Sequence, residues 1–149
     1  MSRKTSTEKT LSIVIPAFNA RASIGQTIKA AADAAAQSCF DAEFILVDDG
    51  STDGTAEAAQ AAQSTFPVRV LSQPNSGRVP SRRNGLAAAK GEFVLLLDSR
   101  VLMAPDSLAY ACERIAKGEL VWNGHVVIDT AGNPYAKFWK VVTYLAWGE

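Results

Sequence analysis

The sequence has 149 residues, of which 48% are hydrophobic and 20% are charged. This length and composition are typical of one globular domain that can bury a core. Fifteen basic residues balance fifteen acidic ones, so no overall charge favours nucleic acid or an anionic membrane, and any anion must be bound locally.

The ends of the chain and the cysteines allow three simple predictions. Residues 1–10 are rich in Ser, Thr and Lys and lack the apolar core of a signal peptide, so we predict a flexible tail. No run approaches the roughly 18 apolar residues that a membrane helix needs. Cys39 and Cys112 are far apart in the sequence, which favours reduced thiols that fill the core, and a cytosolic location, over a disulfide framework.

Predicted strands and helices alternate along the chain. In order they are strand 11–15, helix 22–38, strand 44–47, helix 53–64, strand 68–71, helix 78–90, strand 93–97 and helix 104–117. This alternation predicts an α/β fold with parallel strands and right-handed crossovers. Pro16 is expected to end the first strand, and Ser51 or Thr52 to cap the second helix.

The last third of the chain has weaker signals. Residues 119–122 and 125–128 are short strand candidates around a predicted tight turn. His125 could be a metal ligand or a base, although a structural imidazole is the favoured reading. Residues 135–149 carry aromatic and apolar side chains at helical spacing, and we expect this segment to pack against a further C-terminal segment or a membrane surface in a longer protein.

Polar side chains follow the predicted strands at the points where these strands end. They are Asn19, Asp48, Asp49, Asp98 and Arg100. Because the carboxyl ends of parallel strands meet at one sheet edge, these residues predict a single site, although one Asp could instead only cap a helix. Acids beside an anionic ligand act as hydrogen-bond acceptors or hold a bridging cation. A nucleotide offers targets for both roles.

The predicted helix 78–90 begins with several cations, Arg78, Arg82 and Arg83. Positive charges at a helix N-terminus oppose the helix dipole. An anion facing this end of the helix would explain them, and a solvated basic face is the alternative.

Several short motifs together resemble the family 2 glycosyltransferases of the GT-A fold. They are Ser12–Asn19, Val47–Thr55, Asn75–Gly77, Arg83–Gly85, Ala89–Glu92 and Leu97–Ser99, and they cover about residues 11–117. The resemblance implies a Rossmann-like three-layer sandwich with a mostly parallel sheet over residues 11–134. It also implies an inverting enzyme of polysaccharide or cell-envelope biosynthesis. Such an enzyme transfers a sugar from a UDP- or GDP-type donor to a saccharide or lipid-linked acceptor, in the cytoplasm or at the inner face of the membrane.

The resemblance also implies roles for individual residues. Pro16, Ala17 and Phe18 would line the base pocket, Asp49 would accept a hydrogen bond from the base, and Arg83 would lie near the ribose and phosphates. The predicted donor-binding residues are therefore Pro16, Ala17, Phe18, Asn19, Asp48, Asp49, Arg83 and Asp98.

One motif departs from the family pattern. Asp98 matches the first acid of the Asp-x-Asp motif, but Arg100 and Val101 stand where the family has the acids that hold Mg²⁺ or Mn²⁺. Two alternatives follow: a non-catalytic nucleotide-sugar-binding module, or an enzyme in which the Arg100 guanidinium replaces the metal. Asp98 and Arg100 are thus the catalytic candidates, and no metal ligand is predicted. No residue after Val101 is a convincing general base for the acceptor.

Other nucleotide-binding classes fit less well. The G-x-G-x-x-G motif of dinucleotide oxidoreductases is absent, and residues 16–21 are not the Gly-rich loop of a nucleotidyltransferase. A phosphoacceptor receiver domain would need a Lys at the end of the last strand, and none is present there.

Overall fold

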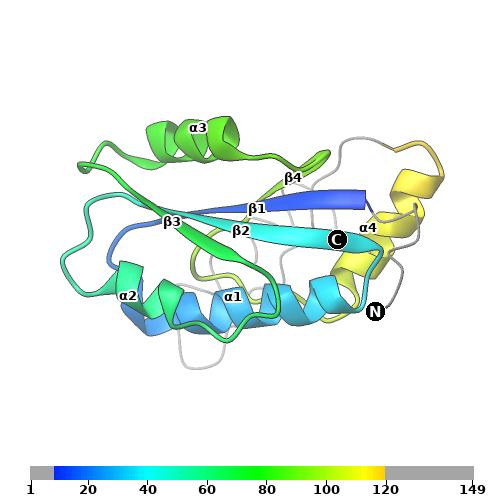
Figure 1. The fold of residues 1–149 in the computed structure, drawn as a ribbon, viewed down its shortest axis with the longest axis horizontal. Helices are drawn as coiled ribbons and strands as arrows, with labels where there is room; N and C mark the ends of the chain where they lie inside the picture. Colours follow the sequence, from blue (N-terminus) through cyan, green and yellow to red (C-terminus); the bar gives the residue numbers. More distant parts are fainter. Residues whose placement is uncertain (1–8, 120–149) are drawn as a thin grey trace, which may run out of the picture. The chain divides into compact units, whose positions relative to one another are not determined.

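The computed structural model describes residues 9–119 (Figure 1). Its elements are β1 (Lys9–Ala17), α1 (Arg21–Ala36), β2 (Phe40–Asp48), α2 (Thr55–Gln60), β3 (Val68–Ser72), α3 (Arg78–Ala88), β4 (Phe93–Leu96) and α4 (Ser107–Ala116). The predicted alternation is confirmed. Of the weaker predictions, the strand candidates beyond Glu119, His125, the aromatic segment 135–149 and tail residues 1–8 lie outside the described residues. Within residues 9–119, no helix is long and apolar enough to cross a membrane.

The strands form one sheet in the order β3-β2-β1-β4, and every neighbouring pair is parallel. α3 covers one face of this sheet, and α1 and α2 cover the other (Figure 1). This arrangement confirms the predicted three-layer α/β sandwich. The parallel register brings the carboxyl ends of the strands to one edge, which is where the predicted site residues follow them.

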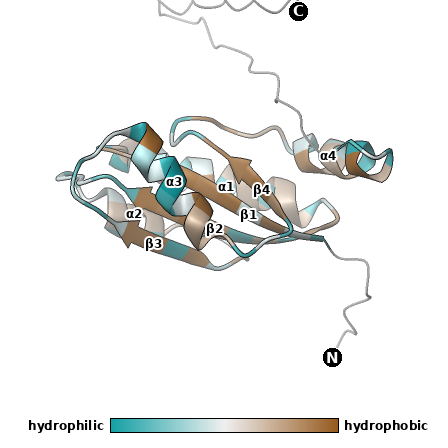
Figure 2. Cartoon of the chain, turned by 90° about the horizontal axis from the view of Figure 1, so that it is seen from above, coloured by the Kyte–Doolittle hydropathy of each residue, from teal (hydrophilic) through white to brown (hydrophobic). Residues whose placement is uncertain are grey.

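The core has two parts because the sheet is covered on both faces. Ile13, Ile15 and Phe44 belong to the larger cluster together with apolar residues of α1, whereas Val14 and Val47 belong to a smaller cluster next to α3. All of them are fully buried, and each such side chain contributes about 1.5–3 kcal/mol. The strands are accordingly hydrophobic along much of their length, while α3 carries hydrophilic residues (Figure 2).

The close packing of α3 on the sheet depends on Gly85. A Cβ atom at this position would lie 2.3 Å from Cγ1 of Val14, and the fully buried Val14 has no room to move away. Glycine therefore lets α3 approach β1 closely, which sets the position of the start of α3 at the sheet edge.

Pro16 does not end β1, contrary to the sequence prediction, because the strand continues to Ala17. The carbonyl of Val14 accepts a hydrogen bond from the N–H of Leu97, on the β4 side. Pro16 is two residues further on and faces the same side, where the pairing with β4 has already ended. Its missing N–H therefore costs no ladder hydrogen bond.

The predicted cap and length of the second helix are also wrong. The residue before α2 is Gly54, whose φ of 87° lies in the left-handed region, and α2 ends at Gln60. The Ser51 hydroxyl instead accepts a hydrogen bond from the N–H of Asn19, and the Thr52 N–H donates to Oδ1 of Asn19. These contacts tie the turn after β2 to the end of β1.

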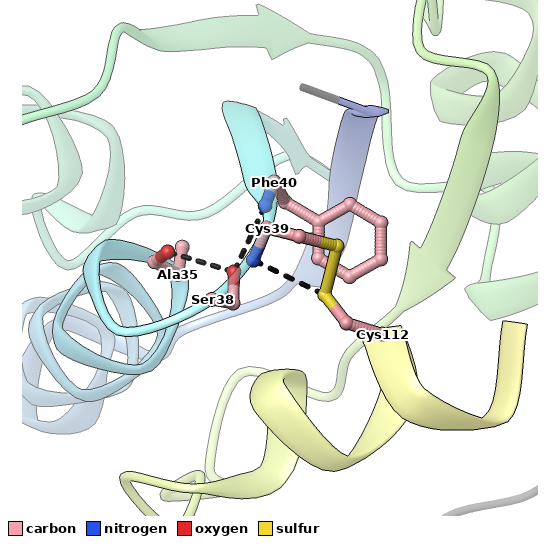
Figure 3. The surroundings of a disulfide bond; sticks show 5 residues. All are labelled: Ala35, Ser38, Cys39, Phe40 and Cys112. Atoms are coloured by element: carbon pink, nitrogen blue, oxygen red, sulfur yellow. Dashed lines mark hydrogen bonds between the residues drawn. A yellow bond between two sulfur atoms is a disulfide. The ribbon is translucent and has the colours of Figure 1, made fainter. Parts of the chain in front are cut away.

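Cys39 and Cys112 form a disulfide, so the prediction of reduced thiols is wrong (Figure 3). Cys39 precedes β2 and Cys112 lies in α4, and their Cα atoms are 6.1 Å apart although they are 73 positions apart in the sequence. Both cysteines pack against the larger core cluster, as predicted for core filler. The packing of α4 near the start of β2 brings the two together, which their separation in the sequence could not indicate.

Candidate functional site

A cavity of about 520 Å³ lies at the carboxyl edge of the sheet. Its lining comes from the end of β1, the end of β2, the turn before α3, the first turn of α3 and the turn after β4. The lining residues are Pro16, Ala17, Phe18, Asp49, Asn75, Gly77, Arg78, Ser81, Asp98, Ser99, Arg100 and Val101. This is where the topology of a parallel α/β sheet places a ligand site.

Asp49 is the most constrained acid of the cavity. It is buried, and its Oδ1 accepts hydrogen bonds from the Gln73 side chain at 2.7 Å and from the Ser76 N–H at 2.8 Å. Its Oδ2 accepts from the Gly77 N–H at 2.8 Å. A carboxylate has about four acceptor positions, so Asp49 fixes the turn before α3 and still has capacity for one further donor.

The same contacts determine the ionisation of Asp49. Burial raises the pKa of this carboxyl, but the hydrogen bonds from Ser76, Gln73 and Gly77, with the nearby Ser81 hydroxyl, outweigh it and hold the pKa below its ordinary value. The Ser81 hydroxyl itself donates to the Gly77 carbonyl at 2.8 Å. Gln73 is in turn held by the Asn84 side chain, which donates to its Oε1 at 2.7 Å. Asp49 is therefore a preorganised, charged acceptor at neutral pH.

Asp98 is paired with a cation. Nη2 of Arg82 donates to its Oδ1 at 2.9 Å, and the two side chains are partly exposed. Nε of Arg82 is buried and has no hydrogen-bond partner among the described residues. The next residue along, Ser99, is anchored through its carbonyl, which accepts from the hydroxyls of Ser23 and Thr27 on α1. The turn that carries Asp98 and Arg100 is thus held in place by α1.

Two cations of the cavity have no partner in the part of the chain that the structure describes. Arg78 and Arg100 both line it, and both are exposed. Within residues 9–119 neither makes an ion pair or a side-chain hydrogen bond. Arg82 pairs with Asp98, whereas the donors to Asp49 are neutral groups. Arg78, Arg82 and Arg100 together therefore leave one positive charge that the two acids do not offset.

The structure brings most of the predicted site residues together. Pro16, Ala17, Phe18, Asp49, Asp98 and Arg100 all line the cavity. Asn19, Asp48 and Arg83 do not. Their predicted role in donor binding remains a prediction.

Asn19 and Asp48 have visible roles in the turn after β2. Asn19 has a φ of 47° and holds Thr52 through its side chain, a conformation that Asn tolerates better than most residues. Oδ1 of Asp48 accepts a hydrogen bond from the Ser51 N–H at 3.1 Å. Both side chains therefore shape the edge of the sheet next to the cavity.

Arg83 is exposed, whereas its neighbour Arg82 contacts Asp98. The family resemblance assigns Arg83, and not Arg82, to the site. Arg78 and Arg82 are the additional residues that the structure brings to the cavity or its rim. The signal that could have found them is their position at the helix start.

The resemblance implies a divalent cation at this edge, but the described residues do not fit one. Residues 9–119 contain no group of three or more His, Cys, Asp or Glu side chains that could hold a metal ion. Both oxygens of Asp49 accept hydrogen bonds, and Asp98 pairs with Arg82. Arg100 adds a positive charge two residues from Asp98, which opposes the approach of a second cation.

Comparison with known proteins agrees with this geometry. The family model described as Glycosyl transferase family 2 matches residues 12–147. A cholesterol galactosyltransferase of Borreliella burgdorferi is 38% identical over 89 residues, which are 59% of this chain and 24% of the relative. An undecaprenyl-phosphate 4-deoxy-4-formamido-L-arabinose transferase of Aeromonas hydrophila is 33% identical over 113 residues, 74% of this chain and 35% of the relative.

A solved structure shows the same fold. TarS 1-349 of S. aureus in complex with UDP-GlcNAc superposes with a TM-score of 0.65 and 27% identity, over 72% of this chain and 31% of the other. The chain thus spans about a quarter to a third of the length of the three proteins named here. With the family match over residues 12–147 and the sheet, helices and cavity described above, the chain belongs to glycosyl transferase family 2.

Proposed function

We propose that this chain is the nucleotide-sugar-binding part of a glycosyltransferase that moves a sugar from a UDP- or GDP-type donor to a saccharide or lipid-linked acceptor. The observation that carries the proposal is the Asp49 carboxylate. It is charged, buried and fixed at the carboxyl end of β2, and one of its hydrogen-bond acceptor positions is unused. It lines a cavity that also holds an exposed aromatic ring, Phe18, and two arginines, Arg78 and Arg100, that make no ion pair with residues 9–119.

The base would bind between Asp49 and the end of β1. Pro16, Ala17 and Phe18 supply apolar surface there, and the Phe18 side chain is 49% exposed, so its ring is available for stacking on a base. Asp49 would accept a hydrogen bond from an N–H group of the base. Both uracil and guanine offer such a donor, so this contact alone does not select between UDP and GDP.

The diphosphate would bind near Asp98 and Arg100. Transfer of the sugar leaves a nucleotide diphosphate on which negative charge develops, and a cation fixed in advance stabilises that charge. Arg100 lies on a turn that α1 anchors through Ser99. Arg82 neutralises Asp98, so this acid does not repel the phosphates. Neither of the catalytic candidates, Asp98 and Arg100, is proposed as the general base that would deprotonate the acceptor.

The acceptor and the location form the remainder of the proposal. The two relatives named above are described as transferases acting on cholesterol and on undecaprenyl phosphate, which supports a lipid-linked acceptor and a place at the inner face of the membrane. The predicted cytoplasmic location rests in part on reduced thiols. Because Cys39 and Cys112 form a disulfide, this location requires that the bond survive in a reducing compartment or form transiently.

A binding and turnover experiment tests the proposal. We would titrate the chain with UDP, GDP and ADP by calorimetry, and assay the full-length gene product for hydrolysis or transfer from UDP- and GDP-sugars. The proposal expects UDP or GDP to bind and the full-length protein to release the matching diphosphate. Absence of binding by every nucleotide, in a chain shown to be folded by circular dichroism, would rule the proposal out.

A non-catalytic nucleotide-sugar-binding module is the second candidate. The Arg82–Asp98 ion pair favours it, since the first acid of the motif is engaged with protein instead of a metal or sugar. This module would bind UDP or GDP with the same residues but would show no turnover in the full-length protein. The assay above separates the two candidates.

A further inference from the structure

The cavity is lined by two arginines and two acids, and Arg82 pairs with one of these acids from outside the lining, so the site as a whole carries one net positive charge. Arg78 contributes from the first turn of α3 and Arg100 from the turn after β4. The acids that could pair with them are already engaged: Asp49 accepts hydrogen bonds from Ser76 and Gly77, and Asp98 pairs with Arg82. An anion entering the cavity would therefore meet two cations that have no competing partner among residues 9–119.

Helix stability does not account for Arg78. It is the first residue of α3, where a positive charge opposes the helix dipole, and the first turn of α3 contains no acidic residue that could offset it. Its side chain is exposed and lines the cavity instead of covering the core. Arg78 is thus placed where an anionic ligand in the cavity would compensate its charge.

We propose that Arg78 is a second phosphate-binding residue of this site and that it clamps the donor diphosphate together with Arg100. This inference rests on the proposed function and adds a residue that the sequence motifs did not assign to the site. A guanidinium donates two parallel N–H bonds to phosphate oxygens, and the two arginines come from different elements that are each anchored to the sheet. A diphosphate presents one phosphate group to each of them.

The clamp predicts which anions bind. A nucleoside diphosphate engages both guanidinium groups, whereas a nucleoside monophosphate engages one. Inorganic pyrophosphate has the same charged part without the base, so it reports on the clamp alone. The preference for UDP over UMP should therefore depend on Arg78.

Calorimetric titrations with UDP, GDP, UMP and inorganic pyrophosphate test this inference, all in chelator so that no metal contributes. The variants are Arg78→Gln and Arg78→Lys. Lys90→Gln is the matched control, because Lys90 is an exposed cation beyond the other end of α3 and outside the cavity lining. Thermal melts confirm that each variant is folded.

Arg78→Gln should weaken UDP and pyrophosphate binding roughly tenfold or more and UMP binding much less. Arg78→Lys should lose less affinity than Arg78→Gln, since lysine keeps the positive charge but cannot donate the two parallel N–H bonds of a guanidinium. Lys90→Gln should change each affinity by less than about twofold. Equal UDP affinities for Arg78→Gln and Lys90→Gln would overturn the inference.

The controls separate failure of this inference from failure of the proposed function. If the parent binds pyrophosphate but neither UDP nor GDP, the nucleotide proposal fails, and loss of pyrophosphate binding in Arg78→Gln still supports the clamp. If the parent binds UDP and Arg78→Gln binds it equally well, the proposed function stands and the clamp is wrong. A parent that binds none of these anions overturns both.

Discussion

Nη2 of Arg82 and Oδ1 of Asp98 lie 2.9 Å apart. The first acid of the Asp-x-Asp motif is therefore paired with Arg82 of α3, and not with Arg83, which the family resemblance assigns to the site. Arg82→Gln should weaken UDP binding roughly tenfold, because the unpaired Asp98 would repel the diphosphate. Arg83→Gln should have a smaller effect, since Arg83 is exposed and outside the cavity lining.

Calorimetry on both variants measures this difference. Stability should fall by less than about 1 kcal/mol in Arg82→Gln, because the ion pair is partly exposed. A larger loss of affinity in Arg83→Gln would show that the motif, and not the ion pair, identifies the donor-binding arginine.

Asp49→Asn should weaken UDP or GDP binding by about 1.5–3 kcal/mol, because a charge-assisted acceptor is lost. The variant also places an amide where Gly77 and Ser76 donate, so chemical denaturation must accompany the titration. Asp48→Asn is the comparison, since Asp48 is buried beside Asp49 but does not line the cavity. Unchanged affinity in a folded Asp49→Asn protein would refute the assignment.

Acid should destabilise the fold through Asp49. Its pKa in the folded state lies below the ordinary value, so between the folded and unfolded pKa values the unfolded state binds more protons. The contribution of Asp49 is therefore fully present at neutral pH and is lost as the pH falls below about 4. Urea denaturation between pH 3 and 7 should show a shallower decline for Asp49→Asn than for the parent; parallel curves would contradict this account.

Donor binding should not need a divalent cation, because Arg100 stands where the family has a metal ligand and Asp98 is already paired. UDP titrations with Mn²⁺, with Mg²⁺ and with chelator should give the same affinity for the parent within about twofold. Arg100→Asp should bind UDP more weakly in chelator and recover affinity with Mn²⁺. A parent that binds only in the presence of metal would overturn this prediction.

The Cys39–Cys112 disulfide should stabilise the chain under oxidising conditions. For a sequence separation of 73, the loop-entropy model gives about 4 kcal/mol, and strain or residual structure lowers this to about 2–4 kcal/mol in practice. Cys112→Ser should lose that amount in urea denaturation and become insensitive to reductant. Thiol titration of the unfolded parent without reductant checks the bond directly, and two free thiols would contradict it.

Local sequence patterns determined the architecture of this protein. Two patterns are visible within short stretches of sequence: the apolar run Phe44–Val47 and the Ala-rich helical spacing of residues 22–38. The structure has a buried strand at the first and a helix at the second. Alternation of such segments requires a parallel sheet, so the grouping of Asp49, Asp98 and Arg100 at one edge could also be predicted.

Tertiary packing decided what periodicity cannot specify. Ser81 and Gly85 form the buried row of α3. Each helical residue turns about 100° from the one before, so Arg82 stays beside that row while Arg83 turns away from the sheet. The partner of Arg82, the disulfide and the continuation of β1 through Pro16 depend on distant segments coming together. Such contacts arise from close packing of elements, and their separation along the chain carries no information about them.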